Sequence, residues 1–334
     1  MNTVGVKRND NIDALKTICA FLVVCIHIKF PSKVDSLISP LERCAVPIFF
    51  MISGYFYCFS WEGKKKIIQI KKLVNLAIAI NIFYLVVNGS VSLVKGMPIY
   101  DYMVSTISLK KVLLFIVTND NAISGHLWYM SAIIYTLIFF GLFPELNSYK
   151  KFRYVIIVAL LVGDLVLGKY SLLILKHEFP LWMSRNFLFV GIPYFWIGNI
   201  IREKNYQKIY AYSKLLPLIY VASIVENYFV SVCGWETVRD HGISTTMLSV
   251  LTFMSMIRLK QRDSILSKIG KTYSQNIYLF HPFVISVLNM IITRGRMREI
   301  YDCCGPIIVF GVTLTILACN NFLMRQFKKE TIYK

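Results

Sequence analysis

The sequence has little charge and lacks the motifs of the common soluble enzymes. Only 16% of the 334 residues are charged, 56% are hydrophobic, and the mean hydropathy is +0.57. Soluble domains carry about 25% charged residues, so a water-soluble enzyme is not expected. The chain also contains no P-loop, no dinucleotide-binding glycine fingerprint and no metal-ligand spacing. We therefore predict no metal site and no bound cofactor.

Cysteine pairs and acidic residues are also scarce. The eight cysteines form no C-x-x-C pair, and several lie inside apolar runs, where a free thiol behaves as a small hydrophobe. Lys and Arg number 37 against 18 Asp and Glu, which gives a net charge of +19. In a soluble protein this charge would indicate nucleic-acid binding. Here no basic stripe stands clear of the hydrophobic runs, so we predict no nucleic-acid partner.

Long apolar runs dominate the sequence and predict membrane-spanning helices. Each span needs about 20 residues, so ten helices use about 200 and leave about 134 for loops. The predicted spans lie near 12–30, 42–60, 73–94, 126–144, 153–168, 185–201, 214–232, 242–258, 272–292 and 304–324. A short amphipathic piece near 109–118 is expected at the membrane interface. No linker or repeat divides the chain, so we predict one all-α transmembrane domain over residues 1–334.

Basic residues predict the orientation of these helices. They concentrate in alternate loops, most clearly in W-E-G-K-K-K-I-I-Q-I-K-K after the second span, although the arginines within 294–298 run against the pattern. The positive-inside rule then places both termini in the cytoplasm. The first apolar run carries Asp13, Lys16 and His27 and lacks a signal-peptide cleavage site, so a permanent first helix is expected. We predict a multi-pass protein of a bacterial plasma membrane, in contact with lipids, and make no prediction of its oligomeric state.

Two ionisable residues of the first span are candidate catalytic groups. Each ionisable group at a helix centre costs at least about 2.5–3.5 kcal/mol. Lys16 and His27 are eleven residues apart, close to three turns, so they share a helix face about 16 Å apart along the axis. Imidazole in a bundle interior is suited to proton transfer. The structural alternatives are that Lys16 snorkels to headgroups and that His27 bonds a neighbouring helix.

Further candidates lie at the outer ends of other spans. Arginine is the natural partner of carbonyl, carboxylate or phosphate oxygens, while the aromatic residues could equally form an interfacial belt. The candidate substrate-binding residues at this depth are Arg43, His126, Trp128, Tyr129, Arg185 and Asn186. Two more histidines, His177 and His241, lie in predicted loops and have no partner that the sequence identifies.

The ninth span contains two more candidate substrate-binding residues, Tyr278 and His281, in Y-S-Q-N-I-Y-L-F-H-P-F. Pro282 frees backbone carbonyls and predicts a kink, which often marks a cavity. The alternative is a structural kink with a satisfied histidine.

Small residues and a proline are expected to interrupt the second span, at Pro47, Ser53 and Gly54. Ser53 has no local base and no nucleophile elbow. Close helix approach is the preferred interpretation.

Five motifs, in order, resemble a known family. They are I-D-A-L-K with the Lys16/His27 pair, R-C-A-V-P-I-F-F-M-I-S-G-Y, H-L-W-Y-M, S-R-N-F-L-F-V-G-I-P-Y-F-W-I-G and I-G-K-T-Y-S-Q-N-I-Y-L-F-H-P. Over nearly the whole length the chain resembles the acyltransferase 3 family of membrane acyltransferases. Several motifs are also similar to the membrane half of VanT-type serine racemases, although no racemase domain is expected here.

The resemblance implies a ten-helix bundle that takes an acyl group, usually acetyl, from cytoplasmic acyl-CoA. The acceptor would be a hydroxyl of an extracytoplasmic or lipid-linked glycan, such as a cell-surface polysaccharide. The family's essential histidine maps to His27 and its basic partner to Lys16, where the family commonly has arginine; lysine keeps the charge but loses the planar fork. The alternative function is a transporter or binding module for a small hydrophilic solute such as serine.

Overall fold

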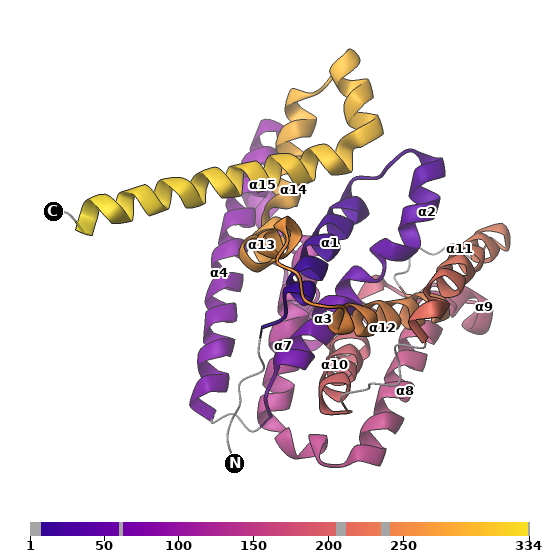
Figure 1. Cartoon of the computed structure of the whole chain (residues 1–334). Helices are drawn as coiled ribbons and strands as arrows, with labels where there is room; N and C mark the ends of the chain where they lie inside the picture. The colour runs from indigo at the N-terminus through magenta and orange to yellow at the C-terminus, as the bar shows by residue number, and fades with distance from the viewer. Residues whose placement is uncertain (1–7, 60–62, 205–211, 235–240, 333–334) are drawn as a thin grey trace. The chain divides into compact units, whose positions relative to one another are not determined.

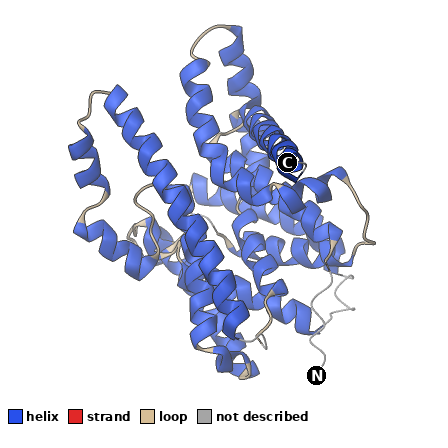
Figure 2. Ribbon diagram, turned by 90° about the vertical axis from the view of Figure 1, so that its left-hand side faces the viewer, coloured by secondary structure: helices blue, strands red, loops and turns tan. Residues whose placement is uncertain are grey.

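The computed structural model describes residues 8–59, 63–204, 212–234 and 241–332, and helices are the only regular elements in these ranges (Figures 1 and 2). By contacts the chain divides into two compact units, which are described separately. Unit 1 comprises Met1–Phe49, Gln207–Tyr228 and Ser244–Lys334, and unit 2 comprises Phe50–Tyr206 and Phe229–Ile243.

Unit 1 contains both ends of the chain. Its helices are α1 (Asp10–His27), α2 (Ser32–Glu42), the start of α3 (Ala45–Phe56), most of α11 (Leu216–Val232), α12 (Ile243–Arg258), α13 (Ile265–Thr272), α14 (Ser274–Ile291) and α15 (Arg296–Ile332). Its apolar core joins α1, α14 and α15 through buried side chains such as Val24, Ile277 and Val309. The rings of Phe21 and Phe310 add an edge-to-face contact at 5.5 Å.

Unit 2 contains the middle of the chain. Its helices are the rest of α3, α4 (Gly63–Val94), α5 (Ile99–Thr106), α6 (Leu109–Thr118), α7 (Trp128–Leu142), α8 (Lys150–Leu167), α9 (Ser171–Leu175) and α10 (Ile192–Lys204). Short turns lie at η1 (Gly125–Leu127), η2 (Pro144–Asn147) and η3 (Leu181–Met183), and a π-helical turn, η4 (Phe187–Gly191), precedes α10. Phe140 stacks on Phe195 at 4.9 Å in its core.

Helices α3 and α10 cross at reciprocal glycine contacts within unit 2. A Cβ on Gly54 would lie 1.8 Å from the carbonyl oxygen of Phe195, and a Cβ on Gly198 would lie 2.0 Å from that of Met51. No side chain fits at either distance, so glycine is required at both positions. The preferred interpretation of Gly54 as a packing residue is confirmed.

A helix lies over each of the ten predicted spans, and α6 coincides with the predicted piece at 109–118. Among the described residues, five helical stretches are long and apolar enough to cross a membrane. They are Ser32–Phe56, Gly63–Val94, Gly125–Leu142, Tyr212–Val232 and Arg296–Gln326. The all-helical class is confirmed, whereas ten crossings and the cytoplasmic termini stay predictions.

The structure also differs locally from the sequence-based expectations. Helix α3 runs unbroken through Pro47, Ser53 and Gly54, so the predicted interruption is wrong; Pro47 stands in the first turn, where its missing N–H has no helical partner to lose. Helices α2 and α13 were not expected, because both are too short and polar to appear as apolar runs. Helix α13 begins instead with a capping box formed by Ser264 and Ser267.

Candidate functional site

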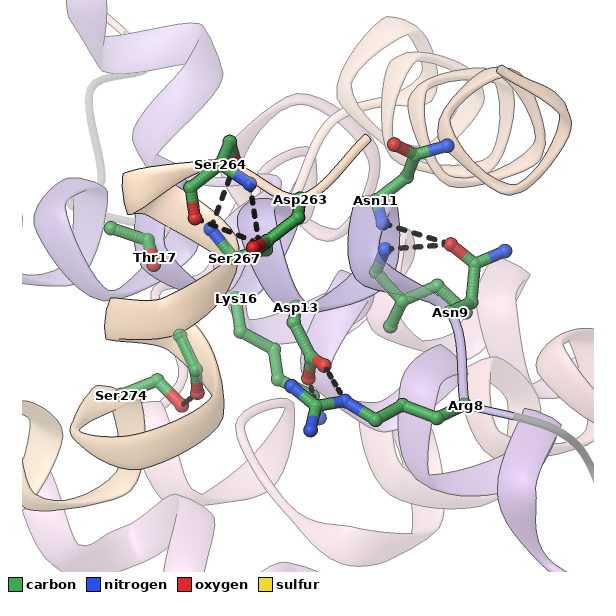
Figure 3. A network of polar contacts seen from close by, with 12 residues as sticks. Arg8, Asn9, Asn11, Asp13, Lys16, Thr17, Asp263, Ser264, Ser267 and Ser274 are labelled. Atoms are coloured by element: carbon green, nitrogen blue, oxygen red, sulfur yellow. Dashed lines mark hydrogen bonds and ion pairs between the residues drawn. The ribbon is translucent and has the colours of Figure 1, made fainter. Parts of the chain in front are cut away.

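Polar contacts hold the N-terminal end of α1 (Figure 3). The side chain of Asn9 caps the helix by accepting from the backbone N–H groups of Asn11 and Ile12. The Asp13 carboxylate lies between two cations, 2.6 Å from Arg8 Nε and 3.0 Å from Lys16 Nζ. One carboxylate against two cations leaves this group with a net positive charge. Lys16 therefore belongs to a charged cluster, and Asp13, for which no role was predicted, belongs to the same cluster.

This end of α1 is also joined to α12 and α13. Asn11 donates to the carbonyl of Leu259, and Thr17 donates to that of Leu266, both at 2.6 Å. A Cβ on Gly270 would lie 1.7 Å from the carbonyl oxygen of Asp13. The motifs I-D-A-L-K and I-G-K-T-Y-S therefore meet at one helix crossing, and Gly270 allows the close approach.

The other end of α1 carries the candidate catalytic histidine beside a second histidine. The ring of His27, the last residue of α1, lies 5.0 Å from the ring of His281 on α14. His281 is fully buried, and its Nδ1 lies 3.0 Å from the carbonyl oxygen of Ile277. A carbonyl only accepts, so Nδ1 carries the proton and Nε2 has the lone pair in the neutral ring. Tyr278 is also buried, with its ring 6.5 Å from that of His281.

A second charged cluster in unit 1 lies next to Arg43, which is the residue that ends α2. Lys29 Nζ lies 2.5 Å from Glu42 and 3.4 Å from Asp35. Glu42 is fully buried, and its Oε1 has no hydrogen-bond partner among the described residues. The sequence missed Glu42, although an acidic residue at the start of an apolar run is a signal of function or pairing.

Unit 2 holds the second group of candidates. His126 is buried in η1, its Nδ1 lies 2.8 Å from the hydroxyl of Ser124, and its ring meets the edge of Tyr84 at 4.8 Å. Tyr129 packs at 4.8 Å, edge to face, on Phe50. The aromatic residues of this motif therefore pack against neighbouring helices of unit 2.

Arg185 and Trp128 are in direct contact. The guanidinium lies over the indole ring, 5.7 Å from its centroid, which is within the range of a cation–π interaction. Asp120 belongs to the same electrostatic group: burial raises its pKa, and the charges of Arg185 and Lys111 oppose the rise. Arginine is the residue type that binds carboxylate and phosphate oxygens through a planar set of N–H donors.

Two asparagines position these groups. The Nδ2 of Asn119 lies 3.4 Å from the carbonyl of Trp128, and its Oδ1 accepts from the Phe187 N–H at 2.7 Å. Asn186 accepts from Leu188 and Phe189 N–H groups through Oδ1 and donates to two carbonyls through Nδ2, so its amide caps η4. The structure thus gives Asn186 a structural role, and its contact with substrate stays a prediction.

The sequence did not predict the buried pair of His241 and Asp164 in unit 2. His241 Nδ1 lies 2.8 Å from Asp164 Oδ2, and both residues are at least 95% buried. The ring of Tyr194 lies 5.8 Å from that of His241. The signal was present, because Asp164 is an ionisable residue inside the predicted fifth span. Its partner could not be named because His241 follows it only after three helices.

The structure therefore places the site candidates in two sets. Unit 1 contains Lys16, His27, Arg43, Tyr278 and His281. Within it, the ring of His281 lies near those of His27 and Tyr278. Unit 2 contains His126, Trp128, Tyr129, Arg185 and Asn186, of which Trp128 and Arg185 are in contact.

Comparison with known proteins agrees with the motifs. Residues 9–319 match the family described as an acyltransferase domain, the acyltransferase 3 family. The chain is 25% identical over 305 residues to a serine/alanine racemase of Enterococcus gallinarum, covering 84% of this chain and 41% of that protein. It is 26% identical over 312 residues to an amino-acid racemase of Enterococcus faecalis, covering 85% and 42%. The chain thus spans less than half the length of these relatives, and no solved structure matches it.

The family match extends from the cap of α1 into α15, and the first and last of the five motifs meet at the crossing of α1 and α13. The chain belongs to the acyltransferase 3 family of membrane proteins.

Proposed function

We propose that this protein is a membrane O-acyltransferase. It takes an acyl group, most simply acetyl, from cytoplasmic acyl-CoA and places it on a hydroxyl of an extracytoplasmic or lipid-linked glycan. The observation that carries the proposal is the histidine pair of unit 1, in which His27 ends α1 beside the buried ring of His281. Family membership supports acyl transfer as the reaction class; the donor and the acceptor are parts of the proposal.

In the proposed reaction, His27 is the general base. Its imidazole accepts the proton of the acceptor hydroxyl while the oxygen attacks the thioester carbonyl carbon. The new C–O bond forms, the C–S bond breaks, and the thiolate of CoA leaves and takes up the proton. Transient acylation of His27 is the alternative order of steps. His281, oriented by the carbonyl of Ile277, is a positioning residue for the ring of His27.

Positively charged side chains are proposed to bind the anionic parts of the donor, the acceptor and the transition state. The net positive cluster of Arg8, Asp13 and Lys16 would attract the phosphates of CoA. Arg43, which belongs to the same unit as His27, would stabilise the oxyanion that develops on the carbonyl. Arg185 and His126, in unit 2, are the proposed partners of acceptor oxygens. Trp128 and Tyr129 are the proposed aromatic contacts of the acceptor's sugar rings.

The racemase activity named for the relatives is not proposed for this chain. Serine/alanine racemase and amino-acid racemase describe proteins of which the matched region is 41% and 42%. Binding or transport of a small solute such as serine is the alternative, and the following experiment separates the two.

The test uses inside-out membrane vesicles and acetyl-CoA labelled in its acetyl group, with label followed into the membrane glycan fraction. We expect transfer by the wild type and a loss of about 10²-fold or more in His27→Ala, the usual contribution of a general base. His177→Ala is the matched control, because His177 is exposed and its ring packs edge to face with that of Phe179 in unit 2. Wild-type rates in folded His27→Ala would contradict the catalytic role. Serine binding without transfer by the wild type would favour the alternative.

A further inference from the structure

An open apolar groove of about 560 Å³ runs along unit 2 between α4, α6 and α7. Its walls include the side chains of Ile78, Ile82, Val112, Phe115, Ile134 and Ile138. Several of these side chains stay accessible, and Ile82 is 56% exposed. A groove of this size and lining is within the range of sites that hold small molecules.

The groove has a single cation at its rim. Lys111, on α6, is the one charged side chain among the residues that line it. Its Nζ donates one hydrogen bond to the carbonyl of Ser105 at 2.6 Å. An ammonium has three donors, so two stay available for an anion. An apolar channel with a cation at its edge complements a hydrocarbon chain that ends in an anionic group.

One end of the groove adjoins the loop that carries His126. Asn121 lines the groove, donates to Asn81 at 2.9 Å, and accepts from the N–H groups of Ile123 and Ser124. The hydroxyl of Ser124 in turn bonds His126. A ligand in the groove would therefore lie beside the loop that carries His126.

We propose that this groove holds the hydrocarbon chain of a polyprenyl phosphate that carries the acceptor saccharide, with the phosphate at Lys111. One channel with one cation fits one chain with one phosphate better than it fits a two-chain phospholipid. The inference rests on the proposed function, since it names the carrier of the glycan that is acylated. Unit 2, which contains this groove, also contains His126 and Arg185, the residues proposed to bind the acceptor saccharide.

Binding of radiolabelled polyprenyl phosphate to the purified full-length protein in detergent tests this assignment. Ala77→Phe fills the groove, and we expect binding to weaken about tenfold or more, because an overfilled apolar site has no room for a ligand. Lys111→Gln should weaken it about three- to tenfold through the lost charge-assisted bond. Ala79→Phe and Lys110→Gln are matched controls on the same helices that do not line the groove, and both should bind as the wild type does.

Competitors identify the ligand. Unlabelled polyprenyl phosphate should displace the probe, while phosphatidylglycerol, uncharged polyprenol and inorganic phosphate should do so poorly. Equal competition by phosphatidylglycerol would overturn the assignment and make the groove a general lipid contact. Wild-type binding by Ala77→Phe or Lys111→Gln would also overturn it. Because Lys111 is exposed, Lys111→Gln provides the test if Ala77→Phe does not fold.

The two proposals fail in different ways. Groove-dependent binding of polyprenyl phosphate without any acyl transfer in vesicles would contradict the proposed function and support the binding site. Acyl transfer that is lost in His27→Ala, together with unchanged probe binding in Ala77→Phe, would support the proposed function and overturn the binding site.

Discussion

His241 and Asp164 form a buried hydrogen bond of 2.8 Å that joins the short segment before α12 to α8 within unit 2. The imidazole belongs to a short connection and the carboxylate to the middle of an apolar helix. A buried polar pair of this kind costs desolvation, which its hydrogen bond must offset. Its contribution to stability can be measured directly.

A double-mutant cycle on this pair should give a large coupling energy. We expect His241→Ala and Asp164→Ala each to destabilise the protein, with a coupling of about 1.5–3 kcal/mol, as found for hydrogen bonds to charged groups. Chemical denaturation in detergent supplies the free energies of unfolding. Exposed His177→Ala should stay within about 0.5 kcal/mol of the wild type. Additive effects of the two substitutions would show that the pair is not coupled.

The crossing of α3 and α10 should not tolerate a methyl group at Gly54. Because a Cβ there would lie 1.8 Å from the carbonyl oxygen of Phe195, Gly54→Ala must move backbone and should cost about 1–3 kcal/mol or more. Gly141→Ala is the matched control, since a Cβ at Gly141, in α7, meets nothing within 4 Å. It should be neutral or stabilise by up to about 1 kcal/mol through helix propensity. Equal melting temperatures for the two variants would contradict the contact.

The ion pair of Arg153 and Glu203 should make stability depend on pH. Arg153 Nη2 lies 2.6 Å from Glu203 Oε2, and the Arg153 side chain is 1% exposed. Burial alone would raise the pKa of Glu203, but the hydrogen bonds and charge of Arg153 outweigh it and lower the pKa below its ordinary value. A carboxyl whose pKa is lowered by folding stabilises the fold above its unfolded pKa. This contribution is lost as the pH falls through the folded pKa.

Melting temperatures measured from pH 7 to pH 3 test this sign. The wild type should exceed Glu203→Gln at neutral pH, and the difference should shrink below about pH 5, near the unfolded pKa of glutamate. Exposed Glu145→Gln, in η2, should show no such difference. A gap between wild type and Glu203→Gln that widens toward acid would refute the assignment.

Asn119 should stabilise the fold through both its backbone conformation and its side-chain hydrogen bonds. Its φ of 59° is left-handed, and its amide contacts Trp128 and Phe187. Asn119→Gly keeps the backbone conformation and loses the hydrogen bonds, at a cost of about 1 kcal/mol each. Asn119→Ala also meets the left-handed penalty of about 1–2 kcal/mol. The order of melting temperatures should be wild type, Asn119→Gly, Asn119→Ala; a more stable Asn119→Ala would exclude a backbone role.

Helix positions and family membership followed from the sequence because both depend on local pattern. Runs of apolar residues about 20 long predicted helices at α1, α4, α7 and α15, and five ordered motifs indicated the family that residues 9–319 match. The rule that ionisable groups inside apolar runs need partners also selected His27 and His281, which do lie together. It could have selected Asp164 on the same ground.

Partners were beyond the sequence because they depend on which helices pack together and at what rotation. No local propensity indicates that Gly270 meets the carbonyl of Asp13, that His241 bonds Asp164, or that the Asn186 amide is used up in capping. Helix α13 begins with a capping box and α2 has no side-chain cap, but both are short and polar. Neither contains a long apolar run by which the sequence could predict it. The sequence by itself determined the long apolar helices, the family and the candidate histidine on α1. Only the tertiary structure decided its neighbour on α14, because residues so far apart in sequence meet through side-chain packing alone.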